Sequence, residues 1–237
     1  MKDKVINIIF SNIKKRVLSE KHTKKENRMK KIYTVLISTL IAAASHSAFA
    51  ADNSVNQAEW IPKLDEYLQT GKFASAREIT TTQPAAAVLE RLKPWAEMGL
   101  TPAQWMYAET MLRSGRNQES ADWTYISFFN TRLDAALCSN VEAKGLEKAI
   151  VSSFNRTVQA ARVHPEMMTQ AIINTIQFQK SKPRSYIANK HPEWLCLMVF
   201  NRDKNKVTVP TSQWGDIYQQ NLDSFTAKTK GSKDQVE

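Results

Sequence analysis

Apolar side chains recur at steps of three and four residues along most of this 237-residue chain. That spacing is typical of one buried face of an α-helix. The first run contains Trp60, Leu64 and Leu68 and stops at Gly71. Later runs stop at Gly99 and Gly115, and glycine is a common signal for the end of a helix. The pattern therefore predicts an all-α chain folded as a single helical domain.

Proline and small polar residues mark where the other helices should begin. Pro84 opens a run in which Pro94 should produce a break or a kink. Thr101 followed by Pro102 matches a capping residue with proline at the first helical position. Further helices are expected to start at Asn117, Asn140, Pro165 and Thr211, the one after Asn140 being a long helix that includes Ala161. From the apolar faces we expect six side chains to be buried together: Trp105, Phe128, Phe129, Ile150, Ile172 and Trp194.

One segment departs from the helical pattern. Trp194–Phe200 (WLCLMVF) is a continuous apolar run, too short for its period to distinguish a strand from a buried helix. Val207-Thr208-Val209 has the β-branched composition of a strand. We therefore expect a short irregular or β segment near residues 194–209.

The N-terminal region has the three parts of a cleavable signal peptide. Met29-Lys30-Lys31 is basic, Ile32–Ala44 is an uncharged run of 13 residues, and Ala48-Phe49-Ala50 ends in the small-x-small pattern of a cleavage site. A membrane anchor needs about 20 apolar residues, and Ser45–Ser47 ends this run too early. We therefore expect cleavage near Ala50 and a mature protein that is periplasmic or secreted.

This cleavage divides the chain and its charge unevenly. Residues 1–28 are expected to be a dispensable basic extension, although their apolar positions also fit a membrane-surface helix. Residues 29–50 are the signal peptide, 51–226 the helical domain and 227–237 a mobile tail. Residues 1–50 carry 11 basic and 3 acidic residues, whereas 51–237 carry 22 and 20. Because nucleic-acid binding needs a concentrated positive field, the nearly neutral mature chain argues against it.

Both cysteines, Cys138 and Cys196, lie in the mature part of the chain. In an oxidising compartment, two cysteines are most simply interpreted as one disulfide. Two buried free thiols or a reactive pair are the alternatives, although no Cys-x-x-Cys spacing supports redox chemistry. A bond between them would close a long loop and stabilise the fold by about 4 kcal/mol.

Motifs for chemistry are absent or ambiguous. The glycines are not clustered as in a phosphate-binding loop, and there is no Gly-x-Ser-x-Gly. His164-Pro165-Glu166 and His191-Pro192-Glu193 could together hold zinc, but each is also a favourable way to begin a helix. Because the His-x-x-x-His spacing is missing, we expect no metal and no cofactor. No catalytic residue is assigned; Asp65, Glu66 and Glu109 are carboxylates whose arrangement in space the sequence does not give.

The mature chain has one strongly basic segment, from Lys180 to Lys206. Seven basic residues face two acidic ones there, Glu193 and Asp203. A solvated loop would account for them, and so would a docking face for an acidic protein partner or an anionic envelope polymer. The candidate partner-binding residues are Lys180, Lys182, Arg184, Lys190, Arg202, Lys204 and Lys206.

Two resemblances bear on function. Residues 101–137 resemble a helix pair of the tetratricopeptide type, with Trp105 early in one helix, Gly115 in the turn and Ala121 in the second helix. The blocks Trp123–Arg132 (WTYISFFNTR), Phe154-Asn155-Arg156 and Pro210–Ile217 look like those of uncharacterised exported helical proteins of Gram-negative bacteria. These resemblances imply an exported helical domain, partly built of helical hairpins, that presents a surface to another protein.

The function expected from the sequence is therefore non-enzymatic. The protein would bind another protein, as an inhibitor, an immunity-type protein or an envelope adaptor. The alternative is an envelope polymer hydrolase whose carboxylates converge only in the folded chain.

Overall fold

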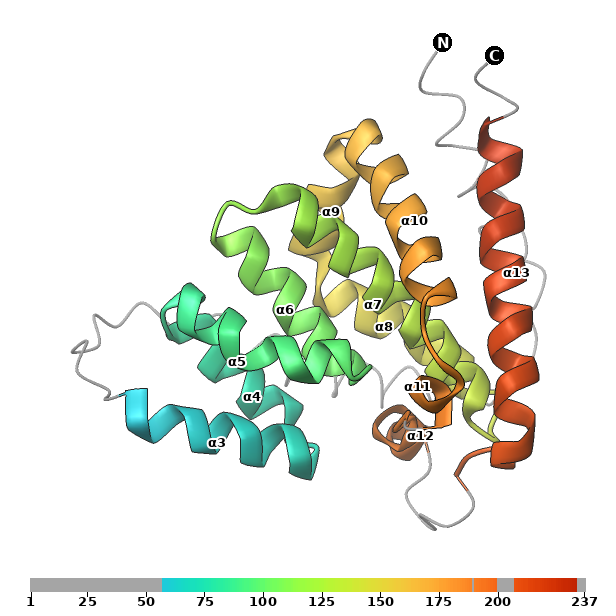
Figure 1. Cartoon of the computed structure of the whole chain (residues 1–237). Coiled ribbons are helices and arrows are strands. Elements are labelled where there is room, and N and C mark those ends of the chain that lie inside the picture. Colours follow the sequence, from blue (N-terminus) through green and yellow to red (C-terminus); the bar gives the residue numbers. More distant parts are fainter. Residues whose placement is uncertain (1–56, 189, 200–206, 234–237) are drawn as a thin grey trace, which may run out of the picture. The chain divides into compact units, whose positions relative to one another are not determined.

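The computed structural model describes residues 57–188, 190–199 and 207–233, of which residues 57, 58, 184, 199 and 228–233 are described by their backbone only (Figure 1). These residues are helical, and no strand occurs among them. The expected signal peptide, the first residues of the mature chain and residues 234–237 lie outside the described ranges. No helix in the described part of the chain is long and apolar enough to span a membrane. The helices are α3 (Gln57–Thr70), α4 (Phe73–Thr82), α5 (Ala85–Glu97), α6 (Thr101–Arg113), α7 (Asn117–Leu137), α8 (Ala143–Ser153), α9 (Asn155–Val163), α10 (Pro165–Lys180), α11 (Arg184–Ala188), α12 (Glu193–Val199), the 3₁₀ turn η2 (Thr211–Gln213) and α13 (Trp214–Lys233).

Three glycines end helices as expected. Gly71, Gly99 and Gly115 all have positive φ, and no other described residue does. At Gly99 the requirement is also steric, because a Cβ there would lie 2.8 Å from the ring of Tyr186. Any other residue at position 99 would therefore strain the backbone and displace a buried aromatic side chain.

Several expected helix boundaries are displaced. The helix α5 is not broken at Pro94, which lies in its last turn, and α4 forms where the sequence pattern predicts no helix. Leu100 and Arg116, not Thr101 and Asn117, occupy the cap positions of α6 and α7. The long helix expected after Asn140 is two helices, because the backbone at Phe154 leaves the helical conformation between α8 and α9.

The helix α7 is central to the fold (Figure 1). It packs against α6, α8, α9 and α10, and α6 packs in turn against α5. Because α7 has neighbours on several sides, it buries polar as well as apolar residues, and almost all of α6 is buried. The pair α6–α7 turns at Gly115, but tetratricopeptide hairpins are not confirmed, since the helices range from 5 residues in α11 to 21 in α7.

Apolar side chains form two main clusters. One joins α3, α4, α5 and α6, and the other joins α7, α11 and α13 through Phe129, Leu133 and Tyr218. The expected single cluster of six side chains is therefore wrong. Trp105 stacks on Phe154 with ring centroids 5.0 Å apart, away from the cluster of Phe129. The other four side chains are only partly buried: Phe128, Ile150, Ile172 and Trp194.

The segment expected to be irregular or β contains a helix and one isolated bridge. Residues 193–199 form α12, and residues 200–206 lie outside the described ranges. Thr208 pairs with Cys138 in a single antiparallel bridge. Two backbone hydrogen bonds flank it, from Ser139 to Val207 and from Val209 to Leu137, each 2.9 Å long. The β-branched composition thus yields one bridge instead of a strand, because the end of α7 offers only a short stretch of extended backbone for pairing.

Candidate functional site

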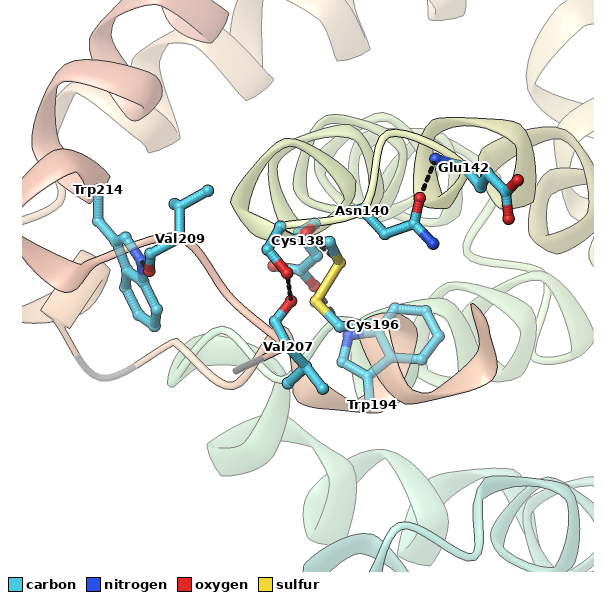
Figure 2. The surroundings of a disulfide bond; sticks show 10 residues. Cys138, Asn140, Glu142, Trp194, Cys196, Val207, Val209 and Trp214 are labelled. Atoms are coloured by element: carbon cyan, nitrogen blue, oxygen red, sulfur yellow. Dashed lines mark hydrogen bonds between the residues drawn. A yellow bond between two sulfur atoms is a disulfide. The ribbon is translucent and has the colours of Figure 1, made fainter. Parts of the chain in front are cut away.

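The expected disulfide is confirmed (Figure 2). Cys138 follows the last residue of α7, Cys196 lies in α12, and their α-carbons are 5.3 Å apart. Both cysteines are buried. The bond therefore holds the short helix α12 against the end of the central helix, close to the bridge at Thr208.

Lys190 is not available to a partner, which corrects its assignment to the docking surface. Its side chain is 0% exposed and its ammonium lies 3.0 Å from the carboxylate of Asp134, which is 1% exposed. The ammonium also donates to the backbone oxygen of Gly99 and to the side-chain oxygens of Thr101 and Asn130. A charge in the protein interior requires such partners, because removal from water is costly. The sequence shows that Lys190 belongs to a basic segment, but it does not show that Lys190 is buried.

The polar groups around this ion pair form one buried network. Asp134 accepts hydrogen bonds from the Thr101 hydroxyl (2.6 Å) and the Trp194 indole (2.9 Å). Asn130 donates to the side-chain oxygen of Gln104 (2.9 Å), and Gln104 donates to the backbone oxygen of Ala96 (2.9 Å). The network joins α6 and α7 to the segment that carries Lys190 and Trp194. The network and the disulfide together hold α11 and α12 against α6 and α7.

Lys180 and Lys182 lie where a partner could reach them. Lys180 is exposed at the end of α10, and Lys182 is partly exposed in the turn that follows. The Lys182 ammonium lies over two rings, 3.8 Å from the centroid of Phe178 and 5.0 Å from that of Tyr186. Burial lowers the pKa of Lys182, while the nearby carboxylate of Glu97 acts in the opposite direction. Neither lysine is within salt-bridge distance of a described carboxylate.

The remaining members of the basic segment are not placed. Arg184 begins α11, but its side chain is not described. Arg202, Lys204 and Lys206 lie outside the described residues. Of the seven basic residues, the structure thus puts Lys180 and Lys182 beside each other on the surface and places Lys190 in the interior.

A groove of about 690 Å³ lies beside these two lysines. One wall comes from the end of α10 and from α11, and the other comes from the first half of α13. Buried apolar side chains also line the groove, among them Trp214, Tyr218 and Leu222 of α13. The polar residues that line it are Gln179, Lys180, Lys182, Thr211, Asp216, Gln219 and Asp223.

The groove has two unusual features. The side chain of Gln179 is buried, and its amide nitrogen has no hydrogen-bond partner. Gly215, in the first turn of α13, has open space where a Cβ would stand, with no described atom within 4 Å apart from its chain neighbours and the backbone of its own helix. The packing of the chain on itself therefore does not require glycine at this position.

Each histidine of the two His-Pro-Glu motifs lies beside its own glutamate at the start of a helix. The His164–Glu166 distance is 3.5 Å and the His191–Glu193 distance is 4.0 Å, and both histidines are exposed. Within the described ranges, no group of three or more His, Cys, Asp or Glu side chains is arranged to hold a metal ion.

Each candidate carboxylate is paired with a different cation. Asp65 pairs with Arg91 and accepts a hydrogen bond from the Trp95 indole, Glu66 pairs with Lys72, and Glu109 pairs with Arg77. These contacts tie neighbouring helices together or hold the turn after α3.

Sequence reasoning missed the residues of the buried network and the second wall of the groove. Asn130 and Asp134 are four residues apart on α7, so they share one face of this helix. This pair of polar residues was the sequence signal for the buried network, because polar groups on a buried helix face need hydrogen-bond partners from other parts of the chain. On α13, Asp216 and Asp223 gave no such signal, since exposed acidic residues are ordinary on a helix surface.

No protein-family model matches this chain, and no curated protein or solved structure matches it. The site is therefore interpreted from its own geometry.

Proposed function

We propose that this protein is exported and acts without catalysis, by binding an acidic group of another protein at Lys180 and Lys182. One observation carries the proposal. The two lysines line one groove together with buried aromatic and aliphatic side chains, and neither forms a salt bridge with a described carboxylate. Charged groups at the edge of an apolar depression are the usual composition of a binding surface.

The state of Lys182 gives a physical reason for affinity. Its ammonium is already partly removed from water and rests on the rings of Phe178 and Tyr186. A partner carboxylate would restore favourable interactions to a charge that has lost part of its hydration. Part of the free-energy cost of removing the Lys182 ammonium from water is therefore incurred when the protein folds, before any partner binds.

The disulfide supports the proposed export, because such bonds persist in oxidising compartments. The partner-binding role expected from the sequence for Arg184, Arg202, Lys204 and Lys206 stays a prediction, because their side chains lie outside what the structure describes. An inhibitor, an immunity-type protein and an envelope adaptor are the roles that fit a binding protein of this kind. The alternative, a polymer hydrolase, has no comparable support, since its candidate carboxylates are each ion-paired.

The test is affinity capture from a periplasmic extract, followed by titration of the purified partner. A Lys180→Ala/Lys182→Ala variant is compared with Lys144→Ala/Lys148→Ala, which removes two exposed lysines from α8. We expect the first variant to lose at least about ten-fold in affinity, which corresponds to about 1.4 kcal/mol, and the second to bind like the wild type. Equal affinity of all three proteins would contradict the proposal.

A further inference from the structure

The groove between α10–α11 and α13 has oppositely charged walls. Lys180 and Lys182 stand on the first wall, and Asp216 and Asp223 on the second. The two aspartates are seven residues apart, so they lie on one face of α13 about two turns from each other. An occupant that is only acidic would meet both aspartates. Charge complementarity therefore favours an occupant with a negative group toward α10 and a positive group toward α13.

The interior of the groove is suited to an apolar side chain. Trp214, Tyr218 and Leu222 lie at steps of four along α13, and Ile187 of α11 lines the same space. All four are buried in the fold and still line the groove. Aromatic and aliphatic side chains of this kind form the anchor pockets of protein interfaces.

Gly215 leaves room for the backbone of the occupant. Glycine in a helix is less favourable than alanine by about 0.5–1 kcal/mol, and no contact within the protein requires it here. The absence of a side chain lets another polypeptide approach the first turn of α13 closely. Gln179 also lines the groove, and its amide nitrogen is buried there without a hydrogen-bond partner.

We infer that this groove binds a single peptide segment of a partner protein, in which an apolar residue separates an acidic from a basic residue. The acidic group lies at Lys180 and Lys182, the apolar side chain enters between Ile187 and Trp214, and the basic group lies at Asp216 and Asp223. This inference rests on the proposed function and specifies the partner's binding segment.

A bulky side chain at position 215 tests the inference without removing any contact of the fold. Gly215→Phe would place a ring in the open space, whereas Gln220→Phe adds the same ring at an exposed position of α13 that does not line the groove. Circular dichroism and thermal melting should show both variants folded like the wild type. The probe is a displayed library of short random peptides, selected on the full mature protein.

We expect the enriched peptides to carry an acidic and a basic residue on either side of an apolar one. Gly215→Phe should weaken their binding by more than about ten-fold and Gln220→Phe should not. Asp216→Lys/Asp223→Lys should select peptides that lack the basic residue. Enrichment without this charge pattern, no enrichment, or equal binding by Gly215→Phe would each overturn the inference. If the natural partner loses affinity for Lys180→Ala/Lys182→Ala but not for Gly215→Phe, the proposed function stands and the peptide mode is wrong.

Discussion

Removing one member of the buried Lys190–Asp134 pair should be among the most destabilising single changes in this protein. Asp134→Leu leaves the Lys190 ammonium in an interior where its side chain is 0% exposed and where its ion pair with Asp134 is lost. Truncating one partner of a buried ion pair typically costs about 3–5 kcal/mol, because the remaining charge is unpaired and desolvated. Lys190→Met leaves the carboxylate of Asp134 in the same position and should cost a similar amount.

Replacing both members should cost less than the two single changes added together, but it should not restore wild-type stability. Lys190→Met/Asp134→Leu contains no unpaired charge, and apolar pairs of similar volume are often as stable as buried ion pairs. However, the Thr101 hydroxyl and the Trp194 indole would lose their acceptor on Asp134, at about 1–3 kcal/mol for each group that stays buried without a partner. The double variant should therefore remain less stable than the wild type, yet be more stable than the sum of the single changes predicts.

Urea unfolding followed by circular dichroism measures these free energies, provided that the slope with denaturant is unchanged. Lys72→Ala is the control, because its pair with Glu66 is exposed, with side chains 55% and 56% accessible, and should contribute less than about 1 kcal/mol. Two results would refute the role given to the buried pair. One is that Asp134→Leu and Lys190→Met lower the free energy of unfolding no more than Lys72→Ala does. The other is that the double variant loses as much free energy of unfolding as the two single variants added together.

Three further outcomes follow from the sequence and the fold. N-terminal sequencing of the protein from a periplasmic extract should begin at or within two residues of Ala51, and a chain retaining the apolar run in the membrane fraction would contradict export. Cys138→Ala/Cys196→Ala should lower the free energy of unfolding in urea by about 4 kcal/mol, since the bond links residues 58 apart, and a loss below about 1 kcal/mol would contradict a structural role. Phe129→Ala should lower the free energy of unfolding by about 3–5 kcal/mol in the same assay, and Phe128→Ala should lower it clearly less, because Phe129 is 1% exposed and Phe128 is only partly buried. The reverse order would mean that the buried face of α7 is misassigned.

Local signals predicted much of the fold. Gly71, Gly99 and Gly115 end helices because a positive φ is a local requirement that glycine meets without strain. Pro165 begins α10 for a similarly local reason. In contrast, α4 was missed because its sequence, FASAREITTT, combines few apolar residues with a run of threonines. Its helical state depends on packing against α3, α5 and α6, which the sequence does not display.

The candidate site was harder to predict, because it depends on contacts between distant residues. Lys190 and Asp134 are 56 positions apart, and a basic segment looks the same in sequence whether a given lysine is paired in the interior or solvated. The disulfide could be expected because two cysteines in a chain that the sequence predicts to be exported have one obvious partner each. The groove could not, since its second wall is an amphipathic helix whose acidic residues are unremarkable until α10 and α11 are placed opposite them.

The central claim is that Lys180 and Lys182 attract and hold an acidic group of a partner protein. Its most direct test is the association rate of the purified partner with the wild type and with Lys180→Ala/Lys182→Ala. The rates are compared at about 0.15 M salt, where the screening length is about 8 Å, and at about 1 M, where it is about 3 Å. We predict a several-fold slower association of the variant at the lower salt and little difference at the higher salt, with the melting temperature lowered only slightly by the loss of the Lys182 contacts with two rings. Equal association rates of the two proteins at both salt concentrations would contradict the claim.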